Sequence, residues 1–282
     1  DSSALFDIGL RTAVASMVGA AMLPPVLTGL VRRSDLDRER ENLAFYADLA
    51  TQHDAAVSFP APRFAPKVAT RRANAVANYI AHGNVEHINF DSSFEPVNPA
   101  MRHLWSRLDR NNVVHAQHWR HDDGPHPTLC VIHGFMGSPY LFNGLFFSLP
   151  WFYKSGFDVL LYTLPFHGRR AQKGSPFSGY GIFQHGMAGF AESMAQAIHD
   201  FRSVIDYLES TGVDRIALTG MSLGGYTSSL IATVEDRLQA VIPNVPVVNP
   251  EGMFDDWFPA NKLVELGRRF GGMTEDSSFA AS

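Results

Sequence analysis

The sequence of 282 residues holds a single cysteine, Cys130, and this scarcity excludes two classes of structure. One cysteine permits neither an internal disulfide nor a cysteine-rich zinc site. Because Cys130 lies in the apolar run 128–132, we expect a buried thiol on a strand. An excess of positive charge is also missing, since 23 basic residues face 28 acidic ones and the net charge is −5. The sequence therefore predicts no nucleic-acid partner.

Histidine is missing from the C-terminal end, because none of the twelve histidines follows Ser222. Strand-like runs are missing after residue 248, where the sequence predicts one helix over 260–270 and then a small, polar end. Four histidines gather between residues 115 and 126, but they lack the Cys/His spacing of a zinc site. We predict no metal ligand and expect exposed strand and loop positions for all four: His115, His118, His121 and His126.

Charge is absent from residues 12–31, which lie between Arg11 and Arg32. Twenty such residues are long enough to cross a bilayer, although Pro24 and Pro25 interrupt any helix there. Three alternatives stay open: a spanning helix, a segment in the membrane interface, or a helix packed on the protein. The sequence fixes no compartment; a cytoplasmic or peripherally membrane-associated protein is expected, with a membrane surface among its candidate partners.

Two features predict a boundary near residue 60. A strongly charged stretch begins at Ser34, which is a suitable N-cap for a helix running toward Ala50. The proline-rich segment 59–66 then predicts an extended connector. We therefore divide the chain into a helical N-terminal extension, 1–60, and a core, 61–282. The chain starts with aspartate rather than methionine, which indicates processing or a piece of a longer product.

After the connector, short apolar runs alternate with helical patterns. Strands are predicted over 113–119, 128–132, 158–164, 215–219 and 240–248, and helices over 140–153, 188–209 and 225–234. This alternation predicts an α/β fold whose doubly wound sheet is mostly parallel, with right-handed crossovers. Pro243 and Pro246 favour an edge position for the last of these strands.

The sequence Gly-Met-Ser-Leu-Gly-Gly at 220–225 directly follows the predicted strand 215–219 and precedes a helical pattern. A G-x-S-x-G between a strand and a helix is typical of a nucleophile elbow, in which a sharp turn exposes a serine hydroxyl. Small residues two places either side of Ser222 let the strand and the helix approach closely. The plainer interpretation, a loop that caps an ordinary helix, explains the strand before the motif less well.

The sequence His-Gly-Phe-Met-Gly-Ser at 133–138 directly follows the predicted strand 128–132. A strand that ends in His-Gly turns sharply and can direct the next backbone N–H into a site. Acyl transfer needs such donors where an oxyanion forms. The candidate donors are the N–H groups of Phe135 and of Leu223, the residue after the candidate nucleophile.

A third turn, Leu-Pro-Phe-His-Gly-Arg-Arg at 164–170, follows the predicted strand 158–164. It lies at the carboxyl end of that strand, where open α/β sheets bind their ligands. We expect His167 to be structural. Arg169 and Arg170 are candidates for an anionic substrate group, although a solvated loop is the simpler interpretation.

Together the three motifs resemble the α/β-hydrolase superfamily, and the resemblance covers about residues 113–250. It implies that the five predicted strands are the second to sixth of that family's sheet. It also implies that Ser222 is the nucleophile and that the N–H groups of Phe135 and Leu223 form the oxyanion hole. No metal and no organic cofactor are implied.

The sequence departs from the superfamily after the serine, where an acid and a histidine ordinarily follow beyond two more strands. The last strands are missing here, and Asp255 and Asp256 are the candidate acids. Three explanations compete. The chain is incomplete, with the remainder in a missing C-terminal part or a partner chain; or His185 or His199 upstream is the base; or the fold is kept without catalysis.

The resemblance implies a serine hydrolase that cleaves carboxylic ester or related acyl bonds through an acyl-enzyme on Ser222. Its expected substrate is a small-molecule ester or a lipid ester. The alternative is a non-catalytic subunit of the same fold in a membrane-associated complex. The 282 residues alone are predicted to be inactive, because they show no histidine downstream of the serine.

Overall fold

The computed structural model describes residues 33–137 and 139–248. Most of them form one compact unit, Asn42–Pro246; the second unit comprises Asp1–Glu41 and Val247–Ser282. The uncharged segment 12–31, the candidate acids and the helix predicted over 260–270 lie outside the described residues. Within the described part, no helix combines the length and the apolar character needed to cross a membrane. The predicted boundary at residue 60 stays a prediction.

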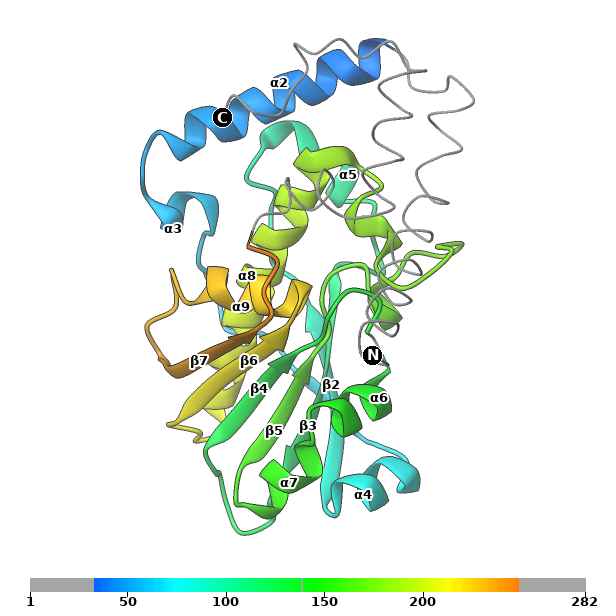
Figure 1. Ribbon diagram of the computed structural model, residues 1–282, viewed down its shortest axis with the longest axis vertical. Coiled ribbons are helices and arrows are strands. Elements are labelled where there is room, and N and C mark those ends of the chain that lie inside the picture. The colour runs from blue at the N-terminus through cyan, green and yellow to red at the C-terminus, as the bar shows by residue number, and fades with distance from the viewer. Residues whose placement is uncertain (1–32, 138, 249–282) are drawn as a thin grey trace, which may run out of the picture. The chain divides into compact units, whose positions relative to one another are not determined.

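A seven-stranded sheet forms the centre of the larger unit, in the order β1-β2-β3-β5-β4-β6-β7 (Figure 1). The neighbours β1/β2, β2/β3 and β3/β5 are antiparallel, whereas β5, β4, β6 and β7 all run parallel. The strands are β1 (Ala69–Arg72), β2 (Asn84–Asp91), β3 (Val113–Arg120), β4 (Thr128–Ile132), β5 (Asp158–Tyr162), β6 (Ile216–Met221) and β7 (Leu238–Asn244). The prediction of a mostly parallel α/β sheet is confirmed.

Helices cover both faces of this sheet (Figure 1). The described helices are α2 (Arg33–Ala50), α3 (Ala55–Ser58), α4 (Ala75–Ala81), α5 (Arg102–Trp105), α6 (Tyr140–Phe146), α7 (Leu149–Lys154), α8 (Gly186–Ser210) and α9 (Leu223–Ile231). Residues of α8 and α9 share one hydrophobic cluster with alternate strand residues, and residues of α4 and α7 share a second cluster on the opposite face.

Strand β4 shows why the sequences of the central strands are almost entirely apolar. All five of its residues are buried. Cys130 and Ile132 pack in the cluster of α8, whereas Leu129 and Val131 pack in the cluster of α4 and α7. Successive side chains point to opposite faces, so a strand covered on both sides needs apolar residues throughout. The buried thiol predicted for Cys130 is confirmed, and burial raises the pKa of that thiol.

The five predicted strands correspond to β3–β7, and β7 is the edge strand within the described residues. Two strands that precede them, β1 and β2, were not predicted. Strand β1 is short and fully exposed and carries no apolar alternation. The single helix predicted over 140–153 is two helices, α6 and α7. They are separated at Ser148, whose φ of 54° is left-handed and ends regular helix.

Candidate active site

Ser222 forms a one-residue turn between β6 and α9, with φ 55° and ψ −115°. This region is sparsely populated for any residue with a side chain, so the neighbouring structure must hold it there. The Ser222 N–H donates to the backbone oxygen of Asn244 in β7 over 3.0 Å. The Asn244 side chain in turn donates to Thr219 Oγ1 over 2.8 Å. Sequence patterns gave no signal for Asn244, which fixes the turn from the adjacent strand.

The glycines around Ser222 are required by close backbone contacts. A Cβ on Gly220 would lie 2.3 Å from the backbone oxygen of Gly224. A Cβ on Gly224 would lie 2.2 Å from the backbone oxygen of Ile132, at the end of β4. Real Cβ atoms do not approach backbone that closely, so these two positions exclude larger residues. The close approach of strand and helix that the motif predicts is therefore present.

The loop after β4 passes beside Ser222. A Cβ on Gly134 would lie 3.6 Å from the Cβ of Ser222, so the two segments are in van der Waals range. Phe135 is partly buried and Leu223 is buried. Within the described residues, neither backbone N–H donates a hydrogen bond to another protein group. The structure thus brings the loop of Phe135 next to the serine, and both candidate donors are unsatisfied.

His133 fixes this loop to the next one. Its Nε2 accepts a hydrogen bond from the Leu164 N–H over 3.2 Å, and its Nδ1 donates to the Gly134 oxygen over 2.8 Å. This pattern requires a neutral ring with the proton on Nδ1. Burial lowers the pKa of His133 from 6.5 to about 4. Both ring nitrogens are engaged, so His133 acts as a structural link beside the candidate nucleophile.

The neutral ring of His133 predicts a loss of stability in mild acid. The unfolded chain takes up a proton near pH 6.5 and the folded protein only near pH 4, so the contribution is complete above 6.5 and falls as pH drops toward 4. At about 1.4 kcal/mol per pH unit, this single group costs roughly 2 kcal/mol at about pH 5. The free energy of unfolding, measured in urea at several pH values, should fall less steeply for His133→Gln.

The exposed His53 supplies the matched control for this prediction. His53→Gln makes the same substitution at an exposed position and so controls for the substitution itself. Part of the slope will persist in His133→Gln, since burial also lowers the pKa of His118 to about 3. Equal slopes for the wild type and His133→Gln would show that the ring does not stay neutral in the folded protein.

The third loop joins the first two through His167, whose ring centroid lies 4.9 Å from that of His133 and 5.9 Å from that of Phe135. Its Nδ1 donates to the Pro165 oxygen over 2.8 Å, while its buried Nε2 has no partner within the described residues. Burial holds the pKa of His167 well below 6.5. These contacts agree with the structural role predicted for His167.

The solvated loop predicted for both arginines is wrong for Arg170. Its guanidinium is fully buried and donates to Asp200 Oδ2 in α8 over 2.6 Å. It also donates to the backbone oxygens of Asn111 and Thr163, over 2.9 and 3.3 Å. A buried cation needs such partners, and Asp200 lies too far along the chain for a local pattern to indicate it. Arg169, by contrast, is exposed.

The exposed position predicted for all four histidines near residue 120 is wrong: His115, His121 and His126 are partly buried, and His118 is fully buried. That side chain is fully buried on β3, with Nδ1 3.3 Å from the hydroxyl of Tyr207, because it points to the face that α8 covers. His121 is half-buried and its Nδ1 lies 2.8 Å from Asp158 Oδ1. In the part of the chain that the structure describes, no three potential metal ligands gather.

Neither upstream histidine considered as a base is hydrogen-bonded to Ser222 in the described residues. His185 precedes α8, and its ring lies 6.5 Å from that of Phe166. His199 lies within α8 and is buried, with Nδ1 3.6 Å from Asp200 Oδ1. We expected the segment that contains His185 and His199 to cover the site. His199 does not do so, since it lies in α8, which packs in the hydrophobic core on one face of the sheet.

Residues 127–267 match a protein family described as the alpha/beta hydrolase fold. This match spans half of the chain and includes all three loops around Ser222. The chain belongs to the alpha/beta hydrolase fold family. The resemblance predicted from the sequence is thereby confirmed, as is the fold class.

This alpha/beta hydrolase is similar to uncharacterized proteins of Mycobacterium tuberculosis strains H37Rv and CDC 1551 / Oshkosh. Each is 33% identical over 169 residues, which cover 57% of this chain and 39% of the relative. The chain thus matches well under half the length of these curated relatives.

Two solved esterases share the fold. Acetyl xylan esterase from Paenibacillus sp. R4 has a TM-score of 0.52 at 16% identity, over 81% of this chain and 69% of that one. Acetyl xylan esterase 1 from Thermoanaerobacterium sp. JW/SL YS485 has a TM-score of 0.53 at 16% identity, over 78% of this chain and 66% of that esterase. At this identity the likeness establishes the fold alone.

Proposed function

We propose that this alpha/beta hydrolase is a serine esterase whose nucleophile is Ser222. The observation that carries the proposal is the strained turn at Ser222, with φ 55°, held by close-packed glycines between β6 and α9. Backbone strain costs stability and persists at functional sites when its surroundings enforce it. A serine that merely capped α9 would need no such conformation, and its side chain makes no capping hydrogen bond.

In the proposed reaction, Ser222 Oγ attacks the carbonyl carbon of the ester. The N–H groups of Phe135 and Leu223 stabilise the negative charge that develops on the carbonyl oxygen, and their lack of other partners supports this assignment. The Oγ proton passes to a general base, for which histidine is the usual residue, and then to the departing alcohol. Water hydrolyses the acyl-enzyme, which releases the acid and restores Ser222.

The side of the site near Phe135 favours an apolar acyl group. The Phe135 ring packs edge-on against Phe177 and Phe183, at centroid distances of 6.0 and 5.6 Å. This aromatic cluster offers apolar surface without charge. Because the similar esterases are named for acetyl xylan, and the sequence suggested lipid esters, we propose carboxylic esters as the substrate class and leave the length of the acyl chain to experiment.

The direct test is reaction of the folded, full-length protein with a fluorophosphonate, which modifies activated serines. We expect one phosphonyl adduct, located on Ser222 by mass spectrometry of the peptide that contains it. Heat-denatured protein is the control, because an unfolded serine is a poor nucleophile near neutral pH. A folded protein that forms no adduct would contradict the proposal and favour the alternative, a non-catalytic subunit with this fold.

A further inference from the structure

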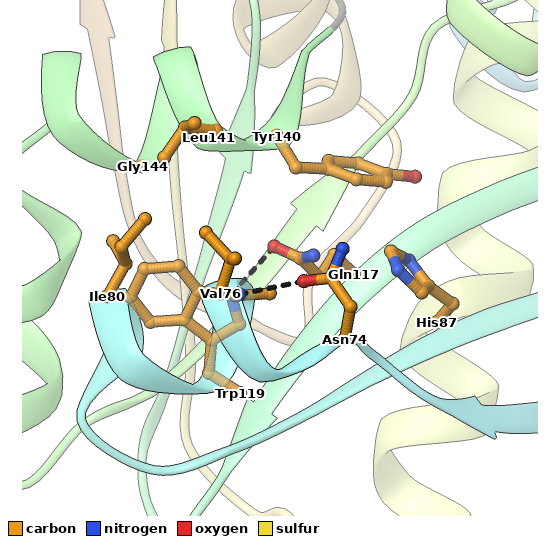
Figure 2. A pocket seen from close by; sticks show the side chains of 10 residues that line it. Asn74, Val76, Ile80, His87, Gln117, Trp119, Tyr140, Leu141 and Gly144 are labelled. Carbon is orange, nitrogen blue, oxygen red and sulfur yellow. Dashed lines mark hydrogen bonds between the residues drawn. The ribbon is translucent and has the colours of Figure 1, made fainter.

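A cavity of about 200 Å³ lies between α4, α6 and strands β2 and β3, lined by residues from all four elements. Figure 2 shows that its two ends differ in chemistry. Ile80, Trp119 and Gly144 form an apolar end, where the buried indole of Trp119 is the floor. His87 and the hydroxyl of Tyr140 lie at the opposite, polar end. The cavity therefore suits a ligand with an apolar and a polar part.

The polar end continues into a row of side chains across three strands. Arg71 of β1 is the register partner of His87 in β2, which is in turn the partner of Gln117 in β3. Register partners project from the same face of a sheet, so all three lie on the face that carries α4 and α6. Gln117 accepts a hydrogen bond from Trp119 Nε1 over 2.9 Å (Figure 2). The row thus connects the floor of the cavity to an exposed arginine.

Two more exposed arginines lie near this end. Arg110 Nε donates to the backbone oxygen of Arg169 over 3.3 Å, which brings the two residues together. Arg169 and Arg71 both lower the pKa of His87, after the larger effect of burial, so both are close enough to act on that ring. The hydroxyl of Tyr140 is hydrogen-bonded to Thr163 Oγ1 over 2.9 Å. The polar end thus has positive charge beside it.

This positive charge is not neutralised within the described residues. No ion pair joins Arg71, Arg110 or Arg169 to a carboxylate there, although Asp91 and Asp109 lie on neighbouring segments. Elsewhere, Arg170, Arg202 and Arg237 do pair with carboxylates. Unpaired cations beside an apolar cavity are complementary to an anion attached to an apolar group.

We propose that this cavity binds an anionic amphiphile, with its alkyl chain against Trp119 and Ile80 and its carboxylate or phosphate head beside Arg71 and Arg169. The proposal goes beyond esterase activity. Of the residues at this site, only Arg169 belongs to a loop that surrounds Ser222. Leu141 lines the cavity and is 50% exposed, so part of the apolar lining is open to solvent.

Octyl phosphate is the probe for the test, with octanol and inorganic phosphate as its two halves. Isothermal titration calorimetry on the full-length protein should show octyl phosphate binding at least tenfold more tightly than either half. The variant Arg71→Gln/Arg169→Gln should lose at least tenfold in affinity for octyl phosphate and keep its affinity for octanol. Val76→Asp places a negative charge on an exposed residue of the cavity wall. It should weaken the binding of octyl phosphate by a similar factor.

The control variant Lys154→Gln/Arg215→Gln removes the same charge from two exposed residues that do not line the cavity, Lys154 at the end of α7 and Arg215 directly before β6. It should bind octyl phosphate as the wild type does. Equal loss in both double variants would overturn the proposal, as would octanol or inorganic phosphate binding as tightly as octyl phosphate. Circular dichroism confirms that each variant is folded.

A second arm identifies the source of the amphiphile. Cosedimentation with phosphatidylcholine vesicles, with and without phosphatidylglycerol, reports binding to a bilayer that contains anionic heads. Loss of vesicle binding in Arg71→Gln/Arg169→Gln would support a bilayer source, and calorimetric binding of octyl phosphate without vesicle binding would support a free amphiphile. If the protein binds neither octyl phosphate nor the vesicles, the proposal is overturned. The assignment of Ser222 is then unaffected, since the fluorophosphonate adduct reports on Ser222 alone.

Discussion

Replacing Ser222 with alanine should lower kcat/KM for a p-nitrophenyl ester by about 10⁴- to 10⁶-fold, the range seen when a serine nucleophile is removed. The hydroxyl is the proposed attacking group, and no other group can form the acyl-enzyme in its place. Steady-state hydrolysis by the full-length protein measures the loss, and the fluorophosphonate adduct should disappear with it. Alanine keeps a Cβ at the same backbone position, so the fold should persist.

Ser229 provides the matched control. It is half-buried in α9 and its hydroxyl donates to the Gly225 oxygen over 3.1 Å, within the same helix. Ser229→Ala should therefore change kcat/KM by less than about threefold, because surface and helix-internal substitutions of this kind have small effects. Full activity in Ser222→Ala, with the adduct on another residue, would remove Ser222 from the mechanism.

The strands and the three loops of this site follow closely from the sequence, because their determinants are local. The apolar runs of β4 and β5 reflect burial on both faces, and the glycines at 220 and 224 reflect contacts within one turn. Strand β1 was missed because its four residues are exposed and include no large apolar side chain. An exposed edge strand is formed by backbone pairing with β2, which no hydrophobic period records.

The charged and polar network beneath the loops was the part that the sequence did not predict. Arg170 pairs with Asp200 and His118 packs against Tyr207, across separations of 30 and 89 residues. Such partners depend on which helix lies on which strand, and α8 supplies both of them. A local sequence pattern therefore predicts a solvent-exposed position for a titratable residue in a loop. Its burial becomes evident only when the packing of a distant helix is known.

Replacing Arg170 with methionine should destabilise the protein by about 3 to 5 kcal/mol, the usual cost of breaking a buried ion pair by removing one partner. The substitution leaves the carboxylate of Asp200 buried with only the hydroxyl of Ser92 as a described hydrogen-bond donor. It also removes the donors to the backbone oxygens of Asn111 and Thr163. Urea unfolding followed by circular dichroism measures the difference in free energy.

Arg169→Met tests whether the effect belongs to the buried position, since Arg169 is the exposed neighbour in the same loop and should cost less than about 0.5 kcal/mol. The double variant Arg170→Met/Asp200→Leu removes both charges. Its loss of unfolding free energy should therefore be smaller than the summed losses of the two single variants by about 1 to 3 kcal/mol. Additive single effects would mean that Arg170 and Asp200 do not interact. A coupling of the expected size would establish that the third loop is fixed to α8 by this pair, independently of any activity at Ser222.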